Sequence, residues 1–322
     1  MEKIVYKYLN RLNKIQKEIL GDNGTIKNEV KFKNELNDIA LNYVDEMKTK
    51  IQEGYYPKNI SYKNELVNLK ILWSLFDDFG FEYIDILFNE FSGKNWKANS
   101  KIRLFMMFVK SVGEIIYLLE GGYASCALGR IRYLYEIGVY LEILNKNSQD
   151  LSRKFLQFSN INRIKIVNQL KDYRLKKKMI KDLKKFKNYM DMWETYGWAK
   201  DILPNEKITF RKLAEITTLR EYYAIYIFSS LSIHADVYGS ANSIDLYTGE
   251  NDRTWITTPS IMGTDIVISN LLLFIFKIST EYFTVENEVI NVFVLLVIRK
   301  VYFFMQDVYK IKNNKLWNYC EV

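Results

Sequence analysis

The sequence predicts an all-α protein built as a multi-helix bundle, and three observations support this fold class. Only three prolines and fourteen glycines occur among 322 residues, whereas sheet sandwiches and barrels need more turn-forming residues. Apolar residues make up 48% of the chain, which is enough for a large buried core. Along most of the chain these apolar residues recur at helical spacing.

Residues 1–60 are predicted to form an N-terminal helical arm. An amphipathic helix over 2–20 ends at a glycine-containing turn. A more polar helix over 29–53 ends before Pro57, because proline cannot continue a helix. The chain then becomes richer in aromatic residues, so we expect residues 61–322 to form the main helical domain.

The main domain is predicted to begin with four helices, over about 63–78, 81–92, 99–119 and 123–145. Gly121 and Gly122 interrupt the pattern between the last two of them, so we expect those two helices to be antiparallel neighbours. Further along, residues 244–260 are expected to form a loop or a short hairpin over the end of the helix that precedes them.

Two apolar runs near the end of the sequence, 266–276 and 289–298, are predicted to be core helices. Polar residues interrupt both, and both are shorter than the roughly 18 to 20 residues that span a bilayer. The start of the chain lacks the continuous apolar region of a signal peptide. Cys126 and Cys320, the two cysteines, are far apart in sequence, which suits a reducing compartment. We therefore expect a cytoplasmic protein with no membrane span.

Several common kinds of site find no support in the sequence. The phosphate-binding patterns GxxxxGK[ST] and GxGxxG are absent, and so is the GxSxG nucleophile elbow. An acidic cluster has no histidine near it in sequence and is expected to be a solvated face: Asp77, Asp78, Glu82 and Asp85. Cys126 lies in an apolar helix and is expected to be a packed thiol. The sequence thus implies neither a metal nor a cofactor.

The stretch 163–187 is strongly basic. It contains eleven Lys or Arg and two Asp, a local net charge of +9 that exceeds the +8 of the whole chain. Such a face could attract the phosphates of RNA, in which case the candidate contacts are Lys176, Lys177, Lys178, Lys181, Lys184 and Lys185. It could equally be a solvated helix whose lysines reflect a lysine-rich coding sequence.

Two polar stripes lie on otherwise apolar predicted helices. Counting back in fours from His234, the one histidine of the chain, gives the first stripe: Ser230, Tyr226 and Tyr222. Arg132 and Glu136, also four residues apart, form the second stripe. A buried charge without a partner is costly, so we expect Arg132 to pair with Glu136 or with a residue of the His234 stripe.

The sequence at these positions resembles a widespread bacterial family of helical proteins. That family is catalogued as a domain of unknown function and is often grouped with HEPN-like bundles. That family has a helix with R-x-x-x-E, then a segment containing Trp, then a helix with Y-x-x-x-S-x-x-x-H. The matching residues here are Arg132 and Glu136, the segment from Trp198, and Tyr226, Ser230 and His234. The resemblance covers about residues 100–245 and implies a HEPN-like core with extra N- and C-terminal helices.

The resemblance implies an RNA-directed, metal-independent ribonuclease or toxin-like effector, with a role in phage defence and a homodimeric state. His234 would exchange a proton with the ribose 2′-oxygen or the leaving oxygen. Arg132 would stabilise charge on the phosphate, and Glu136 would hold either partner, with Ser230 beside them. The sequence departs from such nucleases at one point, because they carry Arg four to six residues before His and here the nearest preceding Arg is Arg220.

Two non-nuclease interpretations stay open. The same polar residues could form a hydrogen-bonded network that fixes helix register in a non-enzymatic sensor or scaffold. They could also border a small-ligand pocket, for a nucleotide for example, lined by Tyr222, Tyr226 and Trp198.

Overall fold

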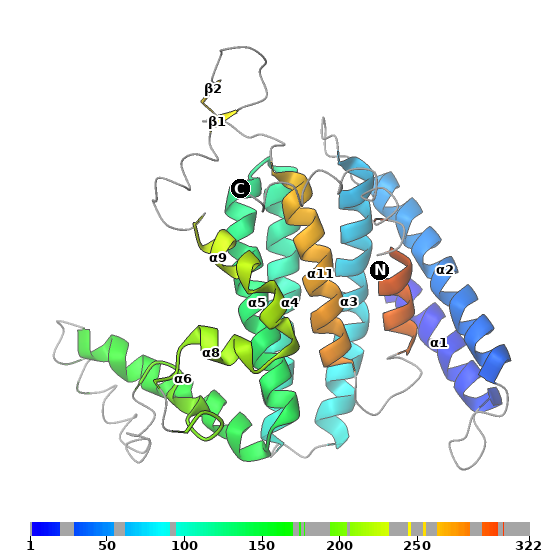
Figure 1. Ribbon diagram of the computed structural model, residues 1–322. Coiled ribbons are helices and arrows are strands. Elements are labelled where there is room, and N and C mark those ends of the chain that lie inside the picture. Colours follow the sequence, from blue (N-terminus) through cyan, green and yellow to red (C-terminus); the bar gives the residue numbers. More distant parts are fainter. Residues whose placement is uncertain are drawn as a thin grey trace.

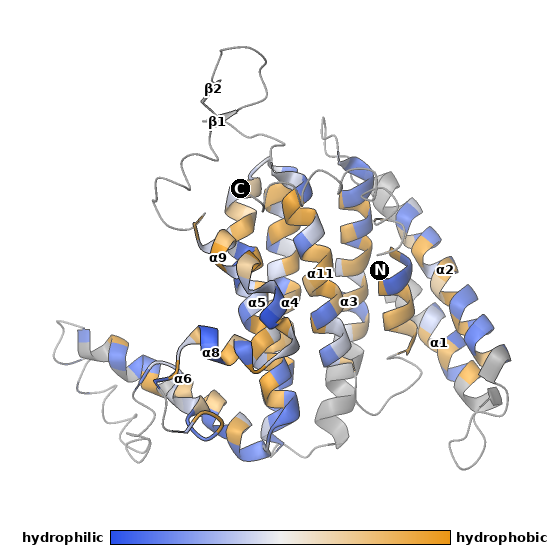
Figure 2. Cartoon of the chain, viewed as in Figure 1, coloured by the Kyte–Doolittle hydropathy of each residue, from blue (hydrophilic) through white to orange (hydrophobic). Residues whose placement is uncertain are grey.

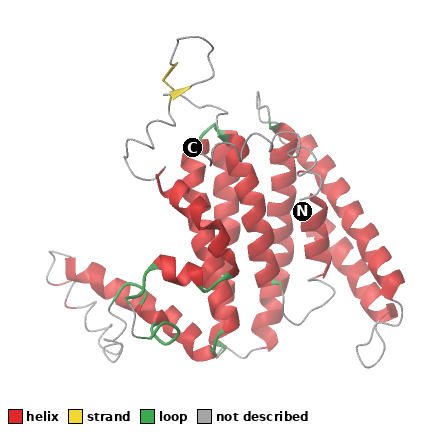
Figure 3. Cartoon of the chain, in the orientation of Figure 1, coloured by secondary structure: helices red, strands yellow, loops and turns green. Residues whose placement is uncertain are grey.

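A computed structural model gives the fold. It describes residues 2–19, 29–54, 62–90, 95–169, 174, 177, 194–204, 207–231, 244–245, 254–255, 263–283, 292–301 and 305. Nearly all of this part is helical, which confirms the predicted all-α class (Figure 3). The exception is a short antiparallel pairing of β1 (Ile244–Asp245) with β2 (Thr254–Trp255), which confirms a hairpin within 244–260.

The helices follow the chain in this order: α1 (Glu2–Ile19), α2 (Glu29–Gly54), α3 (Lys63–Glu90), α4 (Trp96–Glu120), α5 (Ala124–Lys146), α6 (Gln149–Gln169), the 3₁₀-helix η2 (Gly197–Ala199), α8 (Phe210–Glu215), the 3₁₀-helix η3 (Thr218–Tyr222), α9 (Tyr223–Leu231) and α11 (Thr264–Tyr282). Residues 292–301 are also helical. Both predicted C-terminal core helices therefore exist, and their inward side chains are buried.

The centre of the bundle consists of α3, α4, α5 and α11, which stand side by side in Figure 1. The arm helices α1 and α2 pack beside α3, while α6 extends away from the foot of the bundle on the side of α8. In Figure 2, orange apolar residues predominate along the central helix α11, whereas orange and blue residues alternate along the outer helices α2 and α6. The division predicted at residue 60 stays a prediction, as does the homodimer.

The turn between α4 and α5 forms as its sequence predicts. Gly122 adopts a positive φ of 77°, a conformation that suits glycine. The backbone N–H of Tyr123 then donates to the carbonyl of Leu118, 2.8 Å away, and α5 returns alongside α4. This reversal confirms the predicted antiparallel pair, whose helices carry part of the site described below.

The predicted break near residue 80 is wrong, because α3 continues from Lys63 to Glu90. Gly80 lies within it, opposite Phe105 of α4. A Cβ built on Gly80 would lie 2.3 Å from the Phe105 ring. The glycine therefore allows an aromatic ring to approach the helix closely and does not end the helix.

Two smaller expectations are corrected. Cys126 is exposed, so it is not the packed thiol that its apolar surroundings in sequence suggested. In the acidic cluster, Asp77 is exposed but Asp78 is half-buried and accepts a hydrogen bond from the Tyr43 hydroxyl over 3.4 Å. Burial, with the neighbouring Asp77 charge, raises the pKa of Asp78 to about 6. The side chains of Glu82 and Asp85 lie outside the described residues.

Candidate functional site

The site is centred on Arg132, which α5 presents one turn before Glu136. Its Nε donates to Oε1 of Glu136 over 3.3 Å, and its Nη2 donates to the hydroxyl of Tyr226 over 2.9 Å. The guanidinium also lies 4.8 Å from the centre of the Tyr226 ring. Arg132 thus pairs with Glu136 and with one residue of the His234 stripe, which confirms the pairing expected from the sequence.

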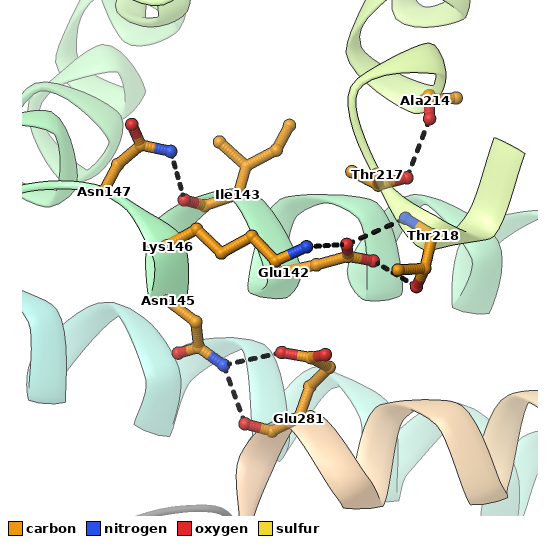
Figure 4. A network of polar contacts seen from close by, with 9 residues as sticks. All are labelled: Glu142, Ile143, Asn145, Lys146, Asn147, Ala214, Thr217, Thr218 and Glu281. Carbon is orange, nitrogen blue, oxygen red and sulfur yellow. Dashed lines mark hydrogen bonds and ion pairs between the residues drawn. The ribbon is translucent and has the colours of Figure 1, made fainter.

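Polar contacts from α5 fix the segment that delivers Tyr226 (Figure 4). Glu142, only 1% exposed, accepts hydrogen bonds from the backbone N–H and the hydroxyl of Thr218, both over 2.8 Å. Because Thr218 is the first residue of η3, the carboxylate satisfies a backbone donor that the helix cannot use. The hydroxyl of Tyr135 donates to the carbonyl of Leu219 over 2.9 Å. The 3₁₀-helix η3, which leads directly into α9, is therefore bonded to α5.

Burial governs the electrostatics of the Arg132 cluster. Burial raises the pKa of Glu136, while the Arg132 guanidinium and the Tyr226 hydroxyl oppose the rise. Burial would lower the pKa of Arg132, but Tyr226 and Glu136 outweigh it and raise that pKa. Arg132 and Glu136 are 26% and 24% exposed, so water or a ligand can reach them. Arg132 uses two of its five N–H donors, and the other three have no partner among the described residues.

The other predicted site residues have different surroundings. The Ser230 hydroxyl donates to the backbone carbonyl of Tyr226 over 2.6 Å, a bond within α9. The Tyr222 ring lies 5.7 Å from the ammonium of Lys277. Lys177 is exposed. The remaining predicted catalytic and RNA contacts lie outside the described residues: His234, Lys176, Lys178, Lys181, Lys184 and Lys185.

The polar stripe of α5 extends one turn further than expected, to Tyr140. The Tyr140 hydroxyl is hydrogen-bonded to that of Tyr196, and the Glu136 charge acts on both. Burial raises the pKa of each tyrosine. Within the described part of the chain, Tyr196 is the one residue other than glycine with a positive φ, 63°, which is uncommon for an aromatic residue. The backbone is therefore strained where it turns this ring toward α5.

Beside Tyr140 and Tyr196 lies a cavity of about 450 Å³. Its walls come from α4, α5, α6 and the segment 195–198, and its lining residues are Arg103, Leu104, Met107, Tyr140, Phe155, Leu156, Phe158, Ser159, Asn162, Lys165, Thr195, Tyr196 and Trp198. We call four of its buried or half-buried side chains the floor: Leu104, Tyr140, Phe155 and Trp198. We call six other lining residues the rim, and all but Met107 are polar: Arg103, Met107, Ser159, Asn162, Lys165 and Thr195. All of them are exposed except Lys165, which is half-buried.

Of the three residues predicted to line a ligand pocket, Trp198 does so. Tyr222 and Tyr226 are not among the residues that line the cavity. Tyr140 was missed although the sequence carries a signal for it, since it continues the four-residue spacing of Arg132 and Glu136. The sequence gives no comparable signal for the other lining residues, because they come from separate elements.

The structure defines an all-α protein that carries a domain of unknown function. Residues 101–253, a little under half of the chain, match the model of the family of unknown function DUF5677. Every lining residue of the cavity and the whole Arg132 cluster fall within that range. The match agrees with the resemblance expected over about 100–245, but nothing in it links the family to HEPN bundles. No curated protein and no solved structure matches the chain.

Two other features are absent from the described part of the chain. None of its helices is long and apolar enough to cross a membrane. In the same residues, no three His, Cys, Asp or Glu side chains are grouped so that they could hold a metal ion.

Proposed function

We propose that this protein is a small-ligand-binding module and that the cavity between α4, α6 and residues 195–198 is its binding site. The observation that carries the proposal is the cavity itself, with about 450 Å³ of space, an aromatic floor and a polar rim. Small-molecule sites typically enclose roughly 300 to 1,000 Å³ and combine apolar walls with a few polar groups.

Contacts among the floor residues support this function because they hold the cavity open in a defined shape. The ring of Trp198 meets Phe155 edge-on at 5.0 Å and Tyr140 edge-on at 5.7 Å between centroids. Trp198 is only 2% exposed. A ligand would therefore enter a site whose walls are already ordered, which reduces the entropic cost of binding.

A screen with a blocked variant tests the proposal. Small neutral, cationic and anionic compounds are screened against the full chain by thermal shift, and hits are measured by calorimetry. Ser159→Trp places an indole at the rim and should abolish saturable binding. Gln169→Trp, on an exposed position of α6 outside the cavity, should leave binding unchanged. The proposal fails if nothing binds the wild type or if Ser159→Trp binds the same compounds as tightly.

The metal-independent ribonuclease is a second candidate, favoured by one specific observation. Arg132 is held by Glu136 and Tyr226, is partly exposed, and keeps three N–H donors that could bind a phosphodiester. In this proposal the ribose 2′-oxygen attacks phosphorus and the 5′-oxygen leaves, with His234 taking or giving the proton. A role as an RNA-directed effector in phage defence depends on this activity.

Incubation of the purified chain with total RNA in EDTA tests this second candidate. Cleavage should occur, Arg132→Gln and His234→Ala should each abolish it, and His234→Ala should change the melting temperature little. Arg103→Gln, in the separate cavity, should cleave like the wild type. If the wild type leaves RNA intact, or if both site variants retain cleavage, the ribonuclease proposal is wrong and the Arg132 cluster is a structural network.

A further inference from the structure

We infer that the cavity takes a planar aromatic ligand carrying one anionic group, such as a nucleoside monophosphate or an aromatic carboxylate, with its ring on the floor and its anion at Arg103 and Lys165. This inference rests on the proposed ligand-binding function and adds the chemical class and orientation of the ligand.

The charges around the cavity favour an anion. Arg103 and Lys165 are cationic, and none of the described residues that line the cavity is Asp or Glu. The Glu136 charge acts on two of the lining residues, Tyr140 and Tyr196, and this carboxylate is itself paired with Arg132. Among the described lining residues, an anion at the rim would therefore meet two cations and no acid.

The two cations suit a phosphate or carboxylate group in their geometry as well. Nε of Arg103 donates to Asn99 over 2.8 Å, a bond that orients the guanidinium and leaves its two Nη groups for an anion. Lys165 lines the same cavity from α6, with its ammonium 5.6 Å from the centre of the Phe158 ring. Asn162, one turn before Lys165, and Ser159 add polar groups to the same wall.

The floor selects a flat, apolar group. Phe155 and Trp198 meet nearly at right angles, with 79° between their planes, so a ring that stacks on the half-buried Phe155 lies edge-on to Trp198. Leu104, 1% exposed, adds an aliphatic contact to the lining. A flexible aliphatic anion would gain less here, because it cannot stack on an aromatic ring.

A further cation at the described end of α6 strengthens the field that the ligand meets. Arg163 is exposed and lies two residues before Lys165 on the same helix. Such charges raise the local concentration of anions and speed their association. Because this effect is long-range, it weakens as salt concentration increases.

Calorimetry with five probes on the full chain tests the inference: adenosine monophosphate, adenosine, inorganic phosphate, indole-3-acetate and indole. The two aromatic anions are adenosine monophosphate, whose neutral parent is adenosine, and indole-3-acetate, whose neutral parent is indole. We expect at least one of these anions to bind about tenfold or more tightly than its neutral parent and than phosphate. Whichever anion binds identifies the source, nucleotide or aromatic acid. Its affinity should fall as sodium chloride is raised.

Matched charge variants locate the anion. Arg103→Gln and Lys165→Gln should each weaken the aromatic anion about threefold to tenfold and leave the neutral parent unchanged. Lys110→Gln removes an exposed cation of α4 outside the cavity and should have no effect. Ser159→Trp should abolish binding of the anion.

The outcomes separate the two proposals. The inferred ligand class is wrong if the neutral parents bind as tightly as the anions or if the Gln variants change nothing. It is also wrong if none of the five probes binds while other screened compounds bind and Ser159→Trp blocks them. In each of these cases the binding function stands. If no compound of any charge binds the wild type, the binding function itself fails.

Discussion

Replacing Glu142 by alanine should lower the free energy of unfolding by about 3 kcal/mol. Glu142 is 1% exposed and accepts from the backbone N–H and the hydroxyl of Thr218 and from the ammonium of Lys146. Hydrogen bonds to a charged group are worth roughly 1.5 to 3 kcal/mol each. Lys146 is 55% exposed and can turn to water, so the two Thr218 bonds dominate. Removing the buried carboxylate also removes its desolvation cost, so the expected loss lies near the lower end of what two such bonds contribute.

Urea unfolding followed by helical circular dichroism measures this loss. Glu142→Gln keeps one acceptor oxygen and should lose about half as much. Thr218→Val removes the hydroxyl donor, and the double variant should show a coupling of about 1 kcal/mol or more with Glu142→Ala. A loss below about 0.5 kcal/mol for Glu142→Ala, or strict additivity in the double variant, would refute the view that this carboxylate ties η3 to α5.

Three further substitutions test other features of the fold. Gly80→Ala should lower the free energy of unfolding by about 1 to 3 kcal/mol in urea, since the added Cβ would lie 2.3 Å from the Phe105 ring; an unchanged midpoint would show that the ring moves aside easily. Asp78 has a folded-state pKa raised to about 6, so the wild type binds a proton more tightly when folded and loses stability as pH rises from about 4 to 6. Asp78→Asn should therefore be more stable than the wild type by roughly 1 kcal/mol at pH 7.5, a value reduced for solvent screening, and by less at pH 5; a gain independent of pH would contradict this. Trp198→Ala should cost about 3 to 5 kcal/mol in the same assay, because this buried ring forms much of the cavity floor, and a loss under 1 kcal/mol would mean that the floor collapses to fill the space.

Local periodicity was enough to predict much of the fold and part of the site. The spacing of four residues between Arg132 and Glu136, and between Tyr226 and Ser230, can be read from each predicted helix alone. The cost of an unpaired buried charge then predicted that Arg132 would pair with Glu136 or with a residue of the His234 stripe, and it contacts both. This reasoning needs no knowledge of how distant helices cross.

The features that the sequence did not reveal depend on contacts between elements. Gly80 resembles a helix breaker until the ring of Phe105 is known to pack on it. Arg103 and Lys165 lie on different helices, and only the angle between α4 and α6 brings both to one cavity. No pattern within a single helix encodes that angle.

Arg132 and Tyr140 belong to one continuous rod. Eight residues of α-helix at 1.5 Å each separate them by about 12 Å along α5, with Glu136 midway. Glu136 is the side chain that the two sites share, because it is paired with Arg132 on one side and its charge acts on Tyr140 on the other.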